Sequence, residues 1–169
     1  RYSNRPHADI KEMNNALINN WNSVVKPNDE VYHLGDFAFA QPGDVENILR
    51  RLNGQKFLIW GNHDKVLMQN KHLQQYFGWC RDYKEIKIQA ENGVLHPTVL
   101  CHYAMLVWNK SHHGSFMLHG HSHGSLVYPK AARIMDVGVD PQNYFPISEH
   151  EVCKRLLKID PPSFDHHGS

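Results

Sequence analysis

The sequence predicts an α/β fold in a single domain that spans residues 1–169. Helical and strand patterns alternate in the first half of the chain, whereas short strand patterns dominate the second half. The length of 169 residues fits one domain, and an apolar fraction of 41% is enough to form a hydrophobic core. We therefore expect layers of helices and sheet.

The first half begins with a helix over residues 9–25, because apolar residues recur there every three or four positions and Asp9 and Glu12 resemble a capping box. The apolar face of this helix is predicted to consist of Ile10, Met13, Leu17, Trp21 and Val24. The elements that follow are a strand over 31–34, a helix capped by Asp44 and stopped by Gly54, a strand over 56–60, and a helix over 65–77 stopped by Gly78.

In the second half, apolar residues alternate with polar ones, as they do in strands. Asn92-Gly93 lies between two such patterns and predicts a hairpin turn. Ser148 and Glu151 form a capping box before a last helix, whose apolar face is predicted to be Val152, Leu156 and Leu157. The strands are expected over 83–89, 98–101, 115–118 and 133–139.

The composition argues against several classes of protein. The formal net charge is +1 without an acidic or basic block, so there is no strong signal for nucleic-acid binding. No apolar run approaches the length of a membrane span, and no signal segment opens the chain. Cys80, Cys101 and Cys153 are widely spaced, which disfavours a disulfide framework or a thiolate zinc site and favours a cytoplasmic location.

Four predicted strands are followed by residues that commonly bind metals. These residues are Gly35-Asp36, Gly61-Asn62-His63-Asp64, His102, and the histidines of the loop 119–123. Ligands bind α/β sheets outside the carboxyl ends of the strands, so we expect these four ends to converge on one point. A carboxylate with imidazoles suits manganese, iron, zinc or nickel better than it suits a nucleophilic triad.

The same residues resemble the motifs of the calcineurin-like metallophosphoesterases. Gly35-Asp36, residues 61–64, His102 and residues 120–123 match, in order, the GD, GNHD, H and GHxH motifs of that family. Asn4-Arg5-Pro6, His102-Tyr103, Trp108-Asn109 and residues 136–140 resemble its small phage-type and bacterial branch, which lacks a cap domain. The resemblance covers nearly the whole chain and implies a two-sheet sandwich flanked by helices.

The resemblance also implies a role for each motif residue. Two divalent metal ions would be held by Asp36 as the bridging ligand, by Asn62, His102 and His121 at the second site, and by His123 at the first. A hydroxide that bridges the metals would attack phosphorus, while His63, oriented by Asp64, would protonate the leaving group. Arg5, Asn62 and Tyr103 would contact the substrate, a small phosphomonoester, phosphodiester or nucleotide.

The family's first motif, Asp-x-His, is absent, because Arg1 to Pro6 resemble the segment that follows it. The resemblance implies that the absent piece contains a central strand and two ligands of the first metal. A sheet without that strand would have a gap, and the first metal would keep only Asp36 and His123. We therefore expect residues 1–169 alone to fold poorly and to bind metal weakly.

The residues leave two other functions open. A catalytically impaired scaffold for protein interaction would explain the absent motif, although a scaffold has no use for His63. A purely structural zinc site fits poorly, since such sites prefer cysteine ligands. Of the other histidines, His119 is expected to be structural, His112 and His113 are undecided, and the rest are expected on the surface or in the core.

Overall fold

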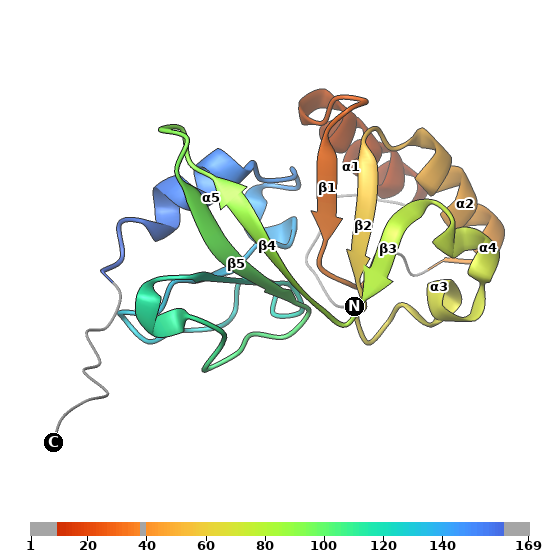
Figure 1. The fold of residues 1–169 in the computed structure, drawn as a ribbon. Helices are drawn as coiled ribbons and strands as arrows, with labels where there is room; N and C mark the ends of the chain where they lie inside the picture. Colours follow the sequence, from red (N-terminus) through yellow and green to blue (C-terminus); the bar gives the residue numbers. More distant parts are fainter. Residues whose placement is uncertain (1–9, 38–39, 161–169) are drawn as a thin grey trace, which may run out of the picture.

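The computed structural model describes residues 10–37 and 40–160, which form two β-sheets flanked by helices (Figure 1). Parallel strands β1 (Glu30–His33), β2 (Gln55–Ile59) and β3 (Phe77–Arg81) form the first sheet in that order. The second sheet has the order β4 (Tyr83–Gln89), β5 (Leu95–Cys101), β6 (Phe116–His119) and β7 (Ile134–Asp136). Within it only β4 pairs in the antiparallel sense, through a hairpin in which Gly93 has φ +83°. The predicted α/β class and the Asn92-Gly93 turn are confirmed.

The helices divide between the two sheets. Helices α1 (Ile10–Val24), α2 (Pro42–Arg51), α3 (Lys65–Gln69) and α4 (Lys71–Gln74) lie on the side of the first sheet, and α5 (Glu149–Leu156) packs on β4 and β7 of the second (Figure 1). Two 3₁₀ turns, Ser111–His113 and Asp140–Gln142, follow β5 and β7. None of the helices in the described ranges has the length and apolar character needed to cross a membrane.

The buried face of helix α1 agrees only in part with the one that the sequence predicted, since Trp21 is buried as predicted and Val24 is not. Ile18, Trp21 and Val25 are buried against Leu52, whereas Val24 is 50% exposed. The prediction was wrong at Val24 because the face that meets the end of α2 passes through positions 18, 21 and 25. The predicted capping box at Asp9 and the side chain of Ile10 lie outside the described parts of the molecule.

The helix predicted over 65–77 is also corrected. Asn70 has an extended backbone (φ −121°, ψ 90°), which divides the segment into α3 and α4. The chain then enters β3 at Phe77, a strand that the sequence did not indicate. Gly78 therefore does not stop a helix. It lies inside β3, where a Cβ atom would collide with the ring of Phe57, so the glycine is needed for close packing.

The predicted helix ends are partly right. Helix α2 begins at Pro42 with Gln41 as the N-cap, so Asp44 is not the cap; the fixed φ of proline suits the first turn of a helix. The hydroxyl of Ser148 accepts a hydrogen bond from the amide of Glu151 at 3.2 Å, as the capping box requires. Cys153 is buried on the inner face of α5, whereas Leu157, predicted there, is 38% exposed.

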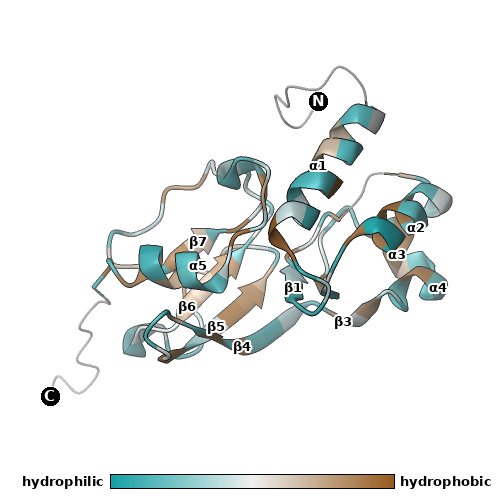
Figure 2. Ribbon diagram, turned by 90° about the horizontal axis from the view of Figure 1, so that it is seen from above, coloured by the Kyte–Doolittle hydropathy of each residue, from teal (hydrophilic) through white to brown (hydrophobic). Residues whose placement is uncertain are grey.

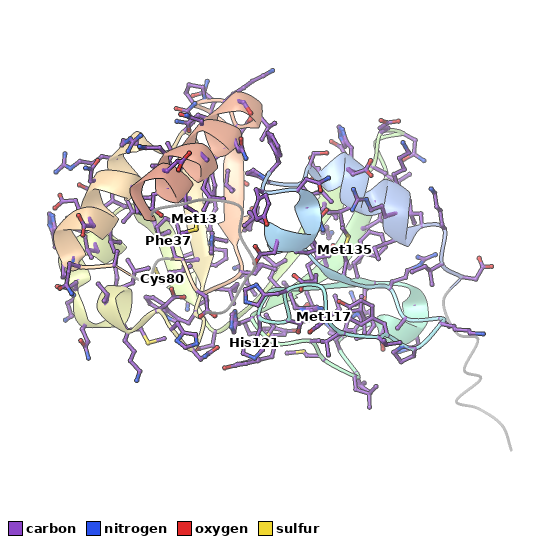
Figure 3. The ribbon with its side chains drawn as sticks, turned by 180° about the vertical axis from the view of Figure 1, so that it is seen from behind. Met13, Phe37, Cys80, Met117, His121 and Met135 are labelled. Atoms are coloured by element: carbon purple, nitrogen blue, oxygen red, sulfur yellow. The ribbon has the colours of Figure 1, made fainter. Side chains whose placement is uncertain are left out.

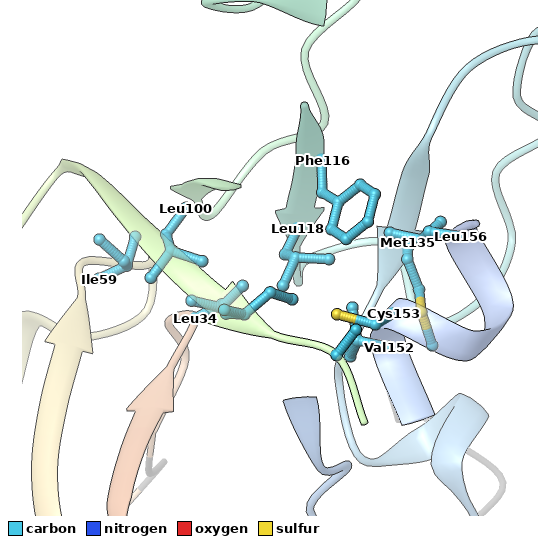
Figure 4. Close-up of a cluster of buried hydrophobic side chains, with 11 residues drawn as sticks. Leu34, Ile59, Leu100, Phe116, Leu118, Met135, Val152, Cys153 and Leu156 are labelled. Atoms are coloured by element: carbon cyan, nitrogen blue, oxygen red, sulfur yellow. The ribbon is translucent and has the colours of Figure 1, made fainter. Parts of the chain in front are cut away.

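The main hydrophobic core joins the two sheets. Leu34, which directly follows β1, and Ile59 of β2 pack against Leu100 and Leu118 of the second sheet, and α5 closes the far side of this core (Figure 4). Hydropathy follows this arrangement, since β5, β6 and β7 are apolar while the outer strand β4 is largely polar (Figure 2). Because the core fixes the two sheets against each other, it also fixes the relative positions of their strand ends.

Candidate metal centre

The carboxyl ends of β1, β2, β5 and β6 converge, as the sequence predicted. Asp36, His102 and His121 each offer one ligand atom, and these atoms lie within 4.8 Å of one another. The side-chain oxygen of Asn62 lies 3.1 Å from Nε2 of His102. His121 is found at the junction of the two halves of the molecule (Figure 3). Four of the five predicted ligands are thus neighbours.

Glycines allow the strand ends to approach this closely. Gly35 has φ +94°, and a Cβ atom there would meet the ring of His102 and lie 2.8 Å from the amide nitrogen of Gly61. A Cβ at Gly120 would lie 2.8 Å from the carbonyl oxygen of Leu34. Real Cβ atoms do not come so near to backbone atoms, so these glycines are required by the close approach of the strand ends.

Replacing Gly35 by alanine is therefore expected to destabilise the fold by about 3 kcal/mol, because the left-handed conformation and the collision act together. Gly43, in α2, provides the matched control, since a Cβ there would meet nothing within 4 Å. Gly43→Ala should stabilise slightly, because alanine favours the helix. Thermal unfolding of both variants measures the difference, and equal melting temperatures would contradict the close approach at Gly35.

The ring of His102 is held in one tautomer. The residue is 1% exposed, and its Nδ1 lies 2.7 Å from the carbonyl oxygen of Leu34. A carbonyl can only accept a hydrogen bond, so Nδ1 carries the proton and donates it. In the neutral ring, Nε2 therefore presents a lone pair toward the other strand ends, as the Nε2 atom of a metal-binding histidine does.

The atoms that surround this lone pair are also electron donors. Nε2 of His102 lies 3.1 Å from Oδ1 of Asn62, 3.1 Å from Nδ1 of His121 and 3.5 Å from Oδ2 of Asp36. A proton on Nδ1 of His121 would satisfy its contact with Nε2 of His102. The oxygens of Asn62 and Asp36 would still face Nε2 of His102, which is an acceptor as they are. A cation would satisfy all four atoms. The donor set of carboxylate, amide oxygen and two imidazoles therefore fits a divalent metal ion.

His121 and His123 both have left-handed backbones, with φ of 60° and 48°. The pKa of His121 is lowered, mainly because burial removes water from the ring and secondly because the ring of His102 lies nearby and repels a positive charge. A lower pKa keeps the imidazole neutral at neutral pH, which is the state that binds a metal. His123, also predicted as a ligand, lies outside the cluster formed by Asp36, His102 and His121. Its Nδ1 pairs with Oδ2 of Asp140.

Asp64 holds two of the site loops together. Its side chain is 1% exposed and accepts three backbone hydrogen bonds, from the amides of Gly61, Asp36 and Phe37, at 2.8, 2.9 and 2.7 Å. The family resemblance implied that Asp64 orients His63. In the structure the two side-chain oxygens of Asp64 bind the backbone of the loops that follow β1 and β2. The amide of His63 donates to Oδ1 of Asp36 at 2.8 Å, while the His63 residue itself is exposed.

The other predicted residues are placed as follows. Tyr103, 49% exposed, lies edge-on to the rings of His102 and His121, with centroids 4.8 Å from each. His119 is buried and bonded to Tyr128, as a structural histidine should be. Cys101 packs into an apolar cluster rather than joining the ligands. Arg5 lies outside the described residues.

Sequence reasoning missed two acidic residues. Asp136 ends β7 and Asp140 begins the turn beyond it, so a fifth strand end bears polar groups near the site. The same rule that selected the other four strand ends applies to β7, but Asp136 and Asp140 were noted only as part of a family resemblance.

Fold and site together define an α/β protein of two sheets that gathers His, Asp and Asn side chains at its strand ends. The chain is 31% identical over 166 residues to the uncharacterized protein MJ1445 of Methanocaldococcus jannaschii, a match that covers 94% of this chain and 83% of that protein. The chain therefore belongs to the same family as MJ1445.

Two further proteins are similar to this chain over most of its length. Gene 66 protein of Mycobacterium phage L5 is 25% identical over 156 residues, which is 78% of this chain and 75% of that protein. The crystal structure of the protein of unknown function AQ665 from Aquifex aeolicus is similar with a TM-score of 0.63 and 27% identity, covering 89% of this chain and 88% of that one. No family model matches the chain.

Proposed function

We propose that this protein is a metal-dependent hydrolase of phosphate esters of the calcineurin-like type. The observation that carries the proposal is the convergence of Asp36, Asn62, His102 and His121 on one point from four strand ends. The order of these residues along the chain matches the order of that family's motifs. A third line of support is the two-sheet α/β architecture, which agrees with the fold that the resemblance implies.

The donor set suits divalent ions of the manganese, iron, zinc or nickel kind. Asp36, Asn62, His102 and His121 would hold one ion, and Asp36 and His123 would contribute to a second. When bound, two such ions supply an activated water molecule and positive charge for the phosphate. Asp36 is the only anion among the five proposed ligands. The charge of these ligands therefore stays well below that of two dications, and the remaining positive charge would attract a phosphate.

His63 is the proposed general acid. Its backbone amide donates to Oδ1 of Asp36 at 2.8 Å, and the residue is exposed, so that an incoming substrate could reach it. His63 also lies near enough to His121 to help lower the pKa of that residue. An imidazolium at this position can donate its proton to the departing oxygen of an ester.

Tyr103 is the proposed substrate contact on the other side of the cluster. Its half-exposed ring covers the edges of His102 and His121, and a flat aromatic ring of this kind can stack on a nucleotide base or another planar leaving group. Leu106 and Val107, 80% and 77% exposed, continue the same loop. These features favour a small phosphodiester or nucleotide substrate.

Replacing Asp36 by asparagine is expected to weaken metal binding at both proposed sites, because one charged oxygen donor is lost from each. Titration with Mn²⁺ followed by calorimetry, together with hydrolysis of a nitrophenyl phosphodiester, measures the effect. Asp44→Asn, on the exposed surface of α2, is the matched control. Full metal content in Asp36→Asn would remove the bridging role. A wild-type protein that hydrolyses no phosphate ester would instead support the scaffold alternative.

A further inference from the structure

His123 and Asp140 form a pair beside the cluster of Asp36, His102 and His121. Nδ1 of His123 and Oδ2 of Asp140 make a short hydrogen bond, and the side chain of His123 is 47% exposed while that of Asp140 is 14% exposed. A carboxylate can only accept, so the pairing places the proton on Nδ1. Nε2 then carries the one lone pair of the neutral ring.

The loop that bears His123 has an unusual backbone. His121, His123 and Gly124 all have positive φ, at 60°, 48° and 74°. Left-handed conformations are costly for residues with a side chain and persist where the surroundings fix them. A specific restraint on this loop is therefore expected from the residues that pack against it.

Asp136 supplies that restraint. The residue is 5% exposed, and its two oxygens accept hydrogen bonds from the amides of Gly124 and Gly138, both at 2.9 Å. The amide of Val137 donates to the carbonyl oxygen of His119 at 2.9 Å. Hydrogen bonds therefore join the end of β7 and the turn after it to the loop after β6, at His119 before His121 and at Gly124 after His123.

The turn that carries Asp140 is itself held by side-chain hydrogen bonds of Gln142. The side-chain amide of Gln142 donates to the carbonyl oxygen of Asp136 at 3.0 Å, and Arg155 of α5 donates to the side-chain oxygen of Gln142 at 2.9 Å. Asp140 thus stands on a braced segment, and its carboxylate meets His123 from a fixed direction.

We propose that Asp140 is a positioning residue for His123, which it holds with the proton on Nδ1 so that Nε2 is the atom offered to a cation. Asp136 holds the main chain of the same loop. The arrangement parallels the way in which the carbonyl of Leu34 sets the tautomer of His102. The part of the proposal that concerns the cation rests on the proposed function, whereas the pairing and the tautomer do not.

The first test is the tautomer of His123 in the metal-free protein, read from long-range ¹H–¹⁵N correlation spectra at a pH where the ring is neutral. The wild type and Asp140→Asn, which keeps an oxygen acceptor, should show the proton on Nδ1, and Asp140→Ala should lose this preference. Glu91→Gln, in the exposed hairpin turn between β4 and β5, is the charge-matched control and should resemble the wild type. A proton on Nε2 in the wild type would overturn the proposal.

The second test is the binding of Mn²⁺ to the same four proteins. Loss of a carboxylate that orients a metal-binding histidine typically costs about 10–100-fold in affinity, so Asp140→Ala should bind one Mn²⁺ ion that much more weakly, with partial recovery in Asp140→Asn. An unchanged isotherm in Asp140→Ala would overturn the positioning role. If the wild type takes up none of Mn²⁺, Fe²⁺, Zn²⁺ and Ni²⁺ but shows the expected tautomer, the proposed function fails and the placement of the ring by Asp140 stands.

Discussion

Replacing Asp64 by alanine is expected to destabilise the protein by about 4 kcal/mol, because three backbone amides lose a buried charged acceptor. Those amides belong to Gly61, Asp36 and Phe37, on the two loops that leave β1 and β2. Asp64 is 1% exposed, so water has little access to replace the carboxylate. For a chain of this size the loss corresponds to a melting temperature lower by roughly 8–16 °C.

Asp64→Asn separates the charge from the shape of the side chain. The asparagine oxygen can take the place of Oδ2 and keep the bonds to Gly61 and Asp36, but its amide group would then face the amide of Phe37, donor against donor. We expect a loss of about 2 kcal/mol, roughly half that of the alanine variant.

The measurement is thermal unfolding followed by circular dichroism, with Asp44→Asn and Asp44→Ala as controls. Asp44 is an exposed residue of α2, and changes at such positions usually stay within about 0.5 kcal/mol. An Asp64→Ala variant that melts within about 2 °C of the wild type would show that the three amides find other partners.

The second large effect is expected at His63. Replacing it by glutamine should lower the turnover of a phosphodiester with a poor leaving group by about 10²–10⁴-fold, the usual contribution of a general acid. The contact that this residue makes with Asp36 uses its backbone amide, which every substitution except proline retains. Metal binding should therefore be nearly unchanged, and the loss should fall on the chemical step.

The sharpest readout is a series of aryl phosphodiesters whose leaving groups differ in pKa. Good leaving groups depart without protonation, so His63→Gln should lose less with them than with alkyl esters. His150→Gln, an exposed histidine of α5, is the matched control and should keep its turnover. Equal losses across the series would reject the acid role of His63, and an unchanged turnover would place the acid elsewhere.

The sequence was sufficient where the local pattern is strong. Periodicity located β1, β2 and α2 to within a few residues, and Asn92-Gly93 located the hairpin. It failed from residue 65 to residue 81, because a helix was predicted over 65–77 and the structure has two short helices followed by β3. The reason is that pairing with β2 stabilises β3, and Gly78 serves the packing of Phe57. Neither contact has a signature in a window of neighbouring residues.

For the site, the sequence by itself was enough to predict that residues able to bind a metal follow four of the strands. Polar residues after apolar strands are a local signal, and the common direction of parallel strands makes their convergence predictable. This rule selected Asp36, residues 61–64, His102 and the loop 119–123, and the family resemblance singled out Asn62 and His121 among them. The structure brings Asp36, Asn62, His102 and His121 together.

The tertiary structure alone decided how these residues are held. The tautomer of His102 depends on the carbonyl of Leu34, 68 residues away, and the buried carboxylates of Asp64 and Asp136 brace loops that follow different strands. Such contacts join segments that only the core brings together. A hydrogen bond depends on distance and direction in space, and neither quantity can be read from the local pattern of residues along the chain.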